Sequence, residues 1–465
     1  MKPSYDAAVV GSGTAGIYFA KLMAEQGYKV CVFDAAKKED LGNRLDIFHS
    51  DSEKFEYFGI PEPKAGDEDY VGRFEYAIVR SALNNYPKRT QYPFTVLSLP
   101  PFLKRLREWA EGFGAEFEYG AAFEDFTYGK DGKINGLTVK KEGKIHGIEA
   151  RLVVDCSGIP SVARRKLKSG SKVETFEIGP RDKFYVLLRY VNLKNPEKDR
   201  VKLAEGWAYY KTWIAPQHNP DGAIIGIGAN LSYEYAEKCF KRFEKIIPLP
   251  EYELDHFERG ETPYRRPPYS LVDGGFICLG DAACMTKPFS GEGITAGWVF
   301  CKIAAEVAGA AMKNGAYPSE DALWEANVRY AKGQGADFAY IMAMLTNAID
   351  STPEENDFEF KKSIVFDEKA MTSMNRNFNA DMPLADSLKL GVNVLGGVIT
   401  GKISAKTLKC LLKGLSAAGA LKKHYKKFPE SPDGFGEWKQ KADALWEKAG
   451  SMADMIDKME ANAAD

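Results

Sequence analysis

The chain has 465 residues, of which 45% are hydrophobic and 28% are charged, and its formal net charge is −2. This length allows two or three domains with a sizeable core, and the near-neutral charge argues against general nucleic-acid binding. Its seven cysteines are scattered and form no CxxC pair. That argues against an iron–sulfur cluster, a zinc ribbon and a secreted disulfide framework, and no metal site is predicted.

The first segment is typical of a dinucleotide-binding unit. An apolar strand over residues 5–10 leads into Gly11-Ser12-Gly13-Thr14-Ala15-Gly16, which opens a helix running to about residue 26. The three glycines permit a tight turn, an approach of the backbone to a pyrophosphate, and close packing of helix on strand. The helix N-terminus adds unpaired N–H groups and a positive dipole. A second strand over residues 28–33 ends in Asp34, which is expected to bind ribose hydroxyls.

The middle of the chain predicts a helix over residues 101–115 and a hairpin meander over residues 121–154. Turn signals at Lys130-Asp131-Gly132 and Lys141-Glu142-Gly143 separate its strands. A second glycine-bearing motif follows in Asp155-Cys156-Ser157-Gly158, with Ser161 and Arg164 behind it. Residues 183–192 and 222–230 predict strands of a separate sheet.

The third motif follows an apolar strand over residues 275–279, which ends at Gly280-Asp281. Pro288 and Gly291-Glu292-Gly293 then lead into an apolar helix from Ile294. A carboxylate here can accept hydrogen bonds from ribityl hydroxyls, and the helix dipole would stabilise a reduced flavin. Three such motifs in this order predict non-covalently bound FAD.

The electron donor has no predicted domain of its own. Gly226-Ile227-Gly228 lacks the third glycine of a dinucleotide motif. We therefore expect NAD(P)H or another reductant, or a redox partner, to bind transiently.

The C-terminal part predicts helices over residues 294–314 and 318–348, followed by an apolar, glycine-rich stretch over residues 390–400. Lys402, Lys406, Lys409 and Lys413 have helical spacing and would share one face. This composition favours contact with an anionic membrane, although a solvated helix face has the same pattern. The N-terminus leaves no room for a signal peptide and no apolar run reaches transmembrane length, which predicts a cytoplasmic protein with peripheral membrane contact.

Together the motifs resemble flavoproteins with the para-hydroxybenzoate hydroxylase fold, and among them the geranylgeranyl reductase family. The resemblance spans residues 4–310. It is carried by the middle motif and by Ser290-Gly291-Glu292-Gly293-Ile294 with Ala296 and Gly297. The chain departs from the family at Leu99, where an Arg is usual, and between Arg44 and His49, where no Cys occurs.

The resemblance implies an α/β fold in three parts. A discontinuous Rossmann-like FAD-binding domain would span residues 1–70, 95–170 and 265–348. An antiparallel-sheet substrate domain would span residues 71–94 and 171–264, and a helical C-terminal region residues 349–465.

The expected site residues fall into two groups. His49, close behind Arg44, is a candidate proton donor. Trp213 lies in Lys211-Thr212-Trp213-Ile214-Ala215-Pro216, where the Trp and Pro match both the reductase family and the halogenases; the alternative is an ordinary core position. The expected cofactor contacts are Gly11, Ser12, Gly13, Thr14, Ala15, Gly16, Asp34, Arg44, Ala122, Gly158, Gly280, Asp281, Gly291, Gly293 and Ile294.

The expected activity is hydride transfer from flavin N5 to a carbon–carbon double bond of an apolar, isoprenoid or lipid-like substrate. The alternatives are a flavin-dependent monooxygenase or halogenase acting on an aromatic or apolar small molecule, and an electron-carrying flavoprotein without catalysis.

Overall fold

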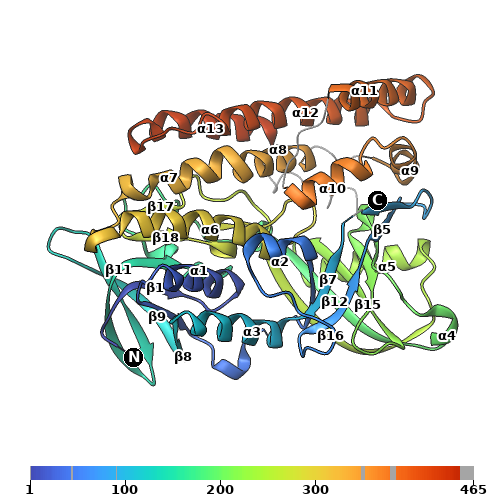
Figure 1. The fold of residues 1–465 in the computed structure, drawn as a ribbon. Helices are drawn as coiled ribbons and strands as arrows, with labels where there is room; N and C mark the ends of the chain where they lie inside the picture. The colour runs from blue at the N-terminus through green and yellow to red at the C-terminus, as the bar shows by residue number, and fades with distance from the viewer. Residues whose placement is uncertain (1, 43–44, 91, 347–350, 378–383, 451–465) are drawn as a thin grey trace.

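The computed structural model describes residues 2–42, 45–90, 92–346, 351–377 and 384–450. It confirms the predicted fold class, with an eight-stranded sheet, a seven-stranded sheet, a small three-stranded sheet and a helical C-terminal region. Figure 1 shows the first sheet at one end of the molecule and the second sheet at the other. The helices α12 and α13 run along one side, next to α7 and α8.

The eight-stranded sheet has a parallel centre in the order β18-β11-β1-β2-β8, with β17 antiparallel at the β18 edge. Six of its strands are β1 (Ser4–Val10), β2 (Val30–Asp34), β8 (Glu116–Tyr119), β11 (Lys144–Asp155), β17 (Val272–Asp273) and β18 (Phe276–Cys278), and β9 and β10 complete it. Ala7, Val9 and Leu152 have no exposed surface. Such continuous apolar strands are typical of a parallel sheet that is covered on both faces.

The predicted hairpin meander is present as β9 (Ala121–Tyr128), β10 (Ile134–Lys141) and the first half of β11. The second half of β11 joins the parallel sheet, so this strand connects the two parts.

Three helices, α1 (Thr14–Glu25), α3 (Leu99–Gly112) and α6 (Ile294–Ala311), share the main core with the parallel sheet, and α1 packs against both others. Among the described residues, α6 alone is long and apolar enough to cross a membrane, but 61% of it is buried inside the protein. Its Trp298 and Phe300 belong to the main core. The composition of α6 is therefore explained by its place as a core helix.

The seven-stranded sheet has the order β16-β12-β15-β14-β13-β5-β6. Its strands are β5 (Ala77–Arg80), β6 (Lys88–Thr90), β12 (Lys183–Leu193), β13 (Glu205–Trp207), β14 (Thr212–Ala215), β15 (Gly222–Asn230) and β16 (Tyr252–Pro263). Helix α5 (Tyr233–Ile246) packs Phe240 and Phe243 against one face. The small sheet is β3 (Ile47–Asp51), β7 (Phe94–Ser98) and β4 (Tyr70–Phe74), and α2 (Ser52–Phe58) follows β3. The domain boundaries given above stay a prediction.

The C-terminal region is a layer of helices. They are α7 (Glu320–Tyr330), α8 (Ala336–Leu345), α9 (Pro353–Lys361), α10 (Glu368–Asn377), α11 (Leu384–Ile399), α12 (Ala405–Tyr425) and α13 (Phe435–Ala449). The predicted helix over residues 318–348 is interrupted by a π-helical segment, Ala331–Gly335. Ser404 caps α12 through the Thr407 N–H. Lys402 therefore lies before the helix rather than on the predicted face, which is a correction to the predicted stripe.

Candidate flavin site

The four central parallel strands end in one row. Val10 pairs with Phe33 of β2 and with Asp155 of β11, and Asp155 pairs with Cys278 of β18. All three glycine-bearing motifs therefore begin at the same edge of the sheet. Ligands of open α/β sheets bind at this carboxyl edge.

The first motif combines closely packed glycines with one that faces open space. A Cβ on Gly11, whose φ is +104°, would lie 2.3 Å from the Cys156 carbonyl oxygen, and one on Gly16 would lie 2.0 Å from the Gly11 oxygen. Gly13, the N-cap of α1, has no atom within 4 Å of such a Cβ. Two glycines are thus required for packing, while the third leaves room beside the N-terminus of α1. That space and the free N–H groups of Thr14 and its neighbours fit a pyrophosphate.

Asp34 is fixed at the end of β2. Its carboxylate accepts hydrogen bonds from Ser12, through the backbone N at 2.6 Å and Oγ at 2.7 Å, and from the Ala36 N–H at 2.8 Å. The Gly120 N–H donates to the Ala36 carbonyl, which brings the start of β9 and Ala122 to the same corner. The structure therefore gathers the predicted adenosine contacts.

The middle motif connects β11 to the late motif through buried hydrogen bonds. Asp155 is fully buried and accepts from Ser157, through N and Oγ, and from the N–H groups of Ala163 and Arg164. Arg164 is also fully buried, and its Nε donates to the Ala282 carbonyl at 2.8 Å. The motif thus links β11 to the late motif. Gly158, with a φ of +72°, forms the turn of this loop.

The late motif places Asp281 at the start of α6. A Cβ on Gly293 would lie 3.0 Å from Asp281 Oδ1, so the carboxylate faces Gly293 and Ile294 at the helix N-terminus. Gly280 and Gly291 adopt positive φ, at +58° and +79°. Burial raises the pKa of Asp281 to about 6. A carboxylate at a helix N-terminus fits the hydroxyl-rich ribityl chain of a flavin.

A charged cluster at this motif was not predicted as a unit. Glu292 accepts a hydrogen bond from Lys287 Nζ at 2.8 Å and pairs with His49 Nε2 through its other oxygen. Asp51, two residues beyond His49, is 7% exposed, and Tyr92 lies nearby. Sequence reasoning identified His49 and the Gly-Glu-Gly run but gave the glutamate no role. The one signal in the sequence was a charged residue between two glycines of a cofactor loop.

The electrostatic interactions in this cluster favour the charged forms of Glu292 and His49. Burial works to raise the pKa of Glu292, but Lys287 and His49 outweigh it and hold this pKa well below its usual range. Partial desolvation works to lower the pKa of the His49 ring, whose side chain is 51% exposed, but the charge and hydrogen bond of Glu292 outweigh it and raise this pKa. Burial raises the pKa of Asp51 to about 6. The ion pair between His49 and Glu292 is therefore favoured near neutral pH.

Trp213 lies on an apolar face of the second sheet. Its indole ring covers Gly226, where an added Cβ would be 2.2 Å from Trp213 Cε2. The face consists of Leu188, Tyr190 and Ile224, with Leu45, Ile47, Val186 and Trp213 partly buried against them. Because side chains alternate along β3, His49 points to the same side as Ile47. Phe48 points instead into the main core, where its ring lies 5.4 Å from Phe102.

Arg44 is outside the described residues. The stretch over residues 390–400 forms the end of α11, whose Asn393 bonds to Lys362 beside α9, and a Cβ on Gly397 would meet Phe358. These contacts are with α9, whereas the Trp213 face contacts β3.

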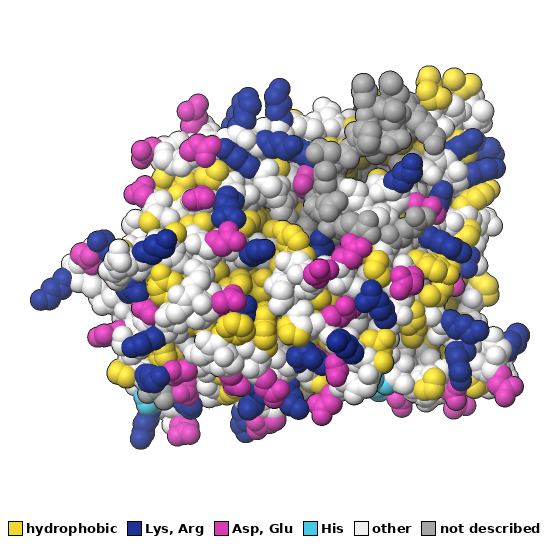
Figure 2. Space-filling view, viewed as in Figure 1, with side chains coloured by type: hydrophobic (Ala, Val, Ile, Leu, Met, Phe, Trp, Pro, Cys, Tyr) yellow, Lys and Arg dark blue, Asp and Glu magenta, His cyan; other side chains and the backbone are white. Residues whose placement is uncertain are grey.

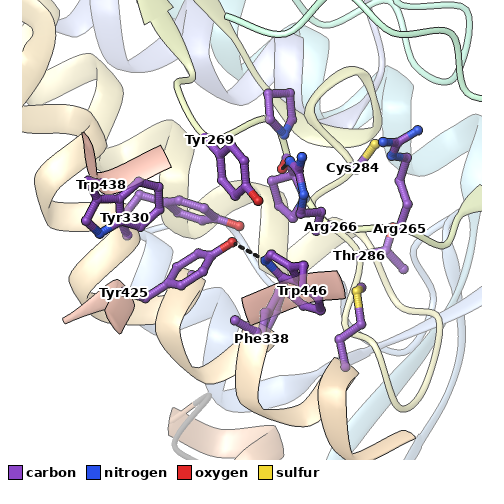
Figure 3. Close-up of a pocket in the computed structure, with 16 residues that line it drawn as sticks. Arg265, Arg266, Tyr269, Cys284, Thr286, Tyr330, Phe338, Tyr425, Trp438 and Trp446 are labelled. Carbon is purple, nitrogen blue, oxygen red and sulfur yellow. Dashed lines mark hydrogen bonds between the residues drawn. The ribbon is translucent and has the colours of Figure 1, made fainter. Parts of the chain in front are cut away.

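A separate cavity lies behind the late motif, between it and the C-terminal helices (Figure 3). Tyr330, Tyr425, Trp438 and Trp446 form much of its wall, and the Trp446 Nε1 donates to the Tyr425 hydroxyl. Its volume is about 20 Å³, which is room for one water molecule. Cys284 and Thr286 of the late motif also line it, so the C-terminal helices pack directly behind the late loop.

Comparisons with known proteins agree with this geometry. A family model described as an FAD binding domain matches residues 4–217. The digeranylgeranylglycerophospholipid reductase of Sulfolobus acidocaldarius is 22% identical over 94% of this chain and 96% of its own length. The enzyme of the same name from Methanocella arvoryzae is 26% identical over 76% of this chain and 90% of its own.

Solved structures show the same fold. A geranylgeranyl bacteriochlorophyll reductase-like protein from Thermoplasma acidophilum has a TM-score of 0.62 and 17% identity, covering 86% of this chain and 99% of its own. A flavin-dependent brominase also has a TM-score of 0.62, with 16% identity over 86% of this chain and 100% of its own. The chain is an FAD-dependent oxidoreductase with a Rossmann-type FAD domain. Along most of its length it is similar to proteins named digeranylgeranylglycerophospholipid reductase and to a geranylgeranyl bacteriochlorophyll reductase-like structure, which confirms the resemblance drawn from its motifs.

Proposed function

We propose that the protein reduces carbon–carbon double bonds of an isoprenoid or similar lipid-like substrate. The observation that carries this proposal is the apolar face around Trp213, which contacts β3 beside the charged cluster of the late motif. The names of the curated relatives support the substrate class. The shared fold with a brominase does not distinguish the two chemistries.

In this proposal each part of the site has one task. Gly13 and the N-terminus of α1 hold the pyrophosphate, Asp34 and Ala122 the adenosine end, and Asp281 the ribityl chain. Bound FAD, when reduced, supplies a hydride from N5. Trp213 positions the apolar chain, and His49 holds the proton that completes saturation of the double bond. Apart from Arg44, which is outside the described residues, the other predicted contacts lie in the same loops.

The test is an anaerobic assay of the FAD-loaded protein with dithionite as reductant and a geranylgeranylated glycerolipid as substrate. Mass spectrometry should show the gain of one pair of hydrogen atoms per double bond. Trp213→Ala should raise KM more than it lowers kcat, because the wall of an apolar pocket binds substrate and transition state alike. Phe257→Ala, an exposed aromatic on β16, is the matched control. Oxygenated or halogenated products in air, with no saturated lipid, would favour the alternative class.

The proposed electron donor is a nicotinamide cofactor or a redox protein that binds transiently. Bleaching of the flavin absorbance by NADPH or NADH under nitrogen would support the first. A flavin that stays oxidised with both, yet is reduced by dithionite, would favour a protein donor.

Peripheral membrane contact is also part of the proposal. On α11, Val392, Leu395 and Ile399 recur at helical spacing and are 71%, 59% and 76% exposed, and Leu412 of α12 is 58% exposed. Figure 2 shows hydrophobic and basic side chains together at the edge over α11. Lys402, Lys409 and Lys413 are exposed beside them. An apolar ridge flanked by lysines suits the surface of an anionic bilayer.

Sedimentation with liposomes tests this contact. Binding should require anionic lipid and fall with salt, because the attraction is screened within about 10 Å at 0.1 M. A triple variant with Lys402, Lys409 and Lys413 changed to Glu should lose binding but keep its FAD. Lys130, Lys140 and Lys144, exposed on the meander, provide the control triple. Equal recovery with neutral and anionic vesicles would refute this part of the proposal.

A further inference from the structure

The loop that carries Glu292 is held together by hydrogen bonds between its own residues. The Lys287 N–H donates to the Glu292 carbonyl at 2.9 Å, and the Gly291 N–H donates to the Lys287 carbonyl at 3.0 Å. The Lys287 side chain is 2% exposed and its ammonium lies 2.8 Å from Glu292 Oε2. Ser290 Oγ donates to the same oxygen at 3.2 Å. One oxygen of the carboxylate is therefore occupied by its own loop, which fixes its direction.

The other oxygen reaches across to β3. Glu292 Oε1 pairs with His49 Nε2, and the edge of the imidazole also contacts the Phe94 ring at 5.7 Å. The His49 side chain is 51% exposed, on the side of β3 that also presents Ile47 to the Trp213 face. With Nε2 directed at Glu292, Nδ1 is on the far side of the ring.

Four charged or titratable groups surround the pair of His49 and Glu292. Lys287 comes from the late loop, Asp51 from β3, Lys54 from α2, and Tyr92 from the segment before β7. Repulsion from the Lys287 ammonium alone would favour the neutral form of the His49 imidazole. Glu292 lies between the two cations and contacts both, so it offsets that repulsion.

From this geometry we infer that Glu292, held in place by Lys287, is a positioning residue that keeps His49 a doubly protonated donor with Nδ1–H directed to the substrate side. The inference rests on the proposed function for what the proton does, but not for the pairing itself. In the reduction, the hydride adds to one carbon of the double bond and the Nδ1 proton to the other. His49 is left neutral and is reprotonated from solvent through its exposed edge.

The experiment is a histidine titration of the FAD-loaded protein by NMR, with [13C]ε1-histidine. The chain has five histidines, and His49→Gln assigns the signal. Glu292→Gln, which keeps the shape but loses the charge, should lower the His49 midpoint by about one pH unit or more. Glu292→Asp should retain part of the difference. Glu149→Gln, on the exposed side of β11, is the control, and His146 on the same strand is an internal reference that should not move.

The second readout is the pH profile of lipid reduction. Its alkaline limb should move by the same amount as the NMR midpoint in Glu292→Gln, with FAD content unchanged. An unchanged midpoint would overturn the inference, as would a limb that stays in place while the midpoint moves. The midpoint is measurable whether or not a substrate turns over, so an inactive wild-type protein would refute the proposed function alone.

Discussion

The two ends of the proposed flavin site consist of different kinds of chemical group. At the proposed pyrophosphate end, Gly11, Gly13 and Gly16 shape the backbone, and the Asp34 carboxylate is fixed by three hydrogen bonds from Ser12 and Ala36. At the flavin end, Lys287, Glu292, His49, Asp51 and Asp281 bring both signs of charge together. Binding a pyrophosphate requires space and N–H donors, whereas proton-coupled chemistry requires titratable groups.

The largest effect is expected from Gly16→Val at the pyrophosphate end. The new Cβ would lie 2.0 Å from the Gly11 carbonyl oxygen, which belongs to the backbone and cannot rotate away. We expect a loss of more than about 3 kcal/mol of folding free energy, with no FAD retained. Urea unfolding and the flavin absorbance measure both. Gly27→Ala, where nothing lies within 4 Å but φ is +87°, should cost less.

Arg164→Met tests the link between the two ends. The arginine is fully buried and bonds to the carbonyls of Ala282 and Glu174. Its loss leaves two buried acceptors without donors, at about 1–3 kcal/mol each. We expect a lower unfolding midpoint and weaker FAD retention together. A variant with normal stability would show that the middle motif does not support the late loop.

Gly13→Ala separates folding from cofactor binding. Its Cβ meets no protein atom within 4 Å, so the unfolding midpoint of the apoprotein should stay within about 1 °C of the wild-type value. FAD affinity should fall at least about tenfold, or 1.4 kcal/mol, because the methyl group enters the phosphate space. Calorimetric titration of apoprotein with FAD measures this. An unchanged affinity for FAD would show that the pyrophosphate does not bind beside Gly13.

Asp51→Asn probes the flavin end through pH. The pKa of Asp51 is about 6 in the folded protein, above that of an unfolded aspartate, so the folded state holds the proton more tightly. Stability should therefore fall as pH rises from about 4 to about 6, by up to about 2–3 kcal/mol, and Asp51→Asn should remove this slope. Urea unfolding across this range measures it. Asp321→Asn, an exposed aspartate on α7, should leave the slope as it is.

The sequence by itself determined the parts of the site that one local segment can specify. The turn between β1 and α1 favours Gly11 because its φ is +104°, and it requires Gly16 because a Cβ there would meet the Gly11 carbonyl oxygen of the same turn. The strand that precedes Asp34 is visible in its apolar run. The same holds for the meander and for the strands ending at Asp155 and at Gly280. These confirmed elements depend on backbone geometry and on periodicity over a few residues, which are local properties.

Only the tertiary structure decided which distant side chains meet. His49 and Glu292 are 243 positions apart, and their contact depends on how β3 faces the late loop. Trp213 meets Ile47 because the second sheet packs on β3, while the apolar stretch over residues 390–400 lies against α9 instead. The hydrophobic effect is non-directional, so an apolar run predicts that its side chains will be buried but not which element will bury them. Long-range ion pairs likewise leave no periodic trace in the chain, which is why the charged cluster appeared only with the fold.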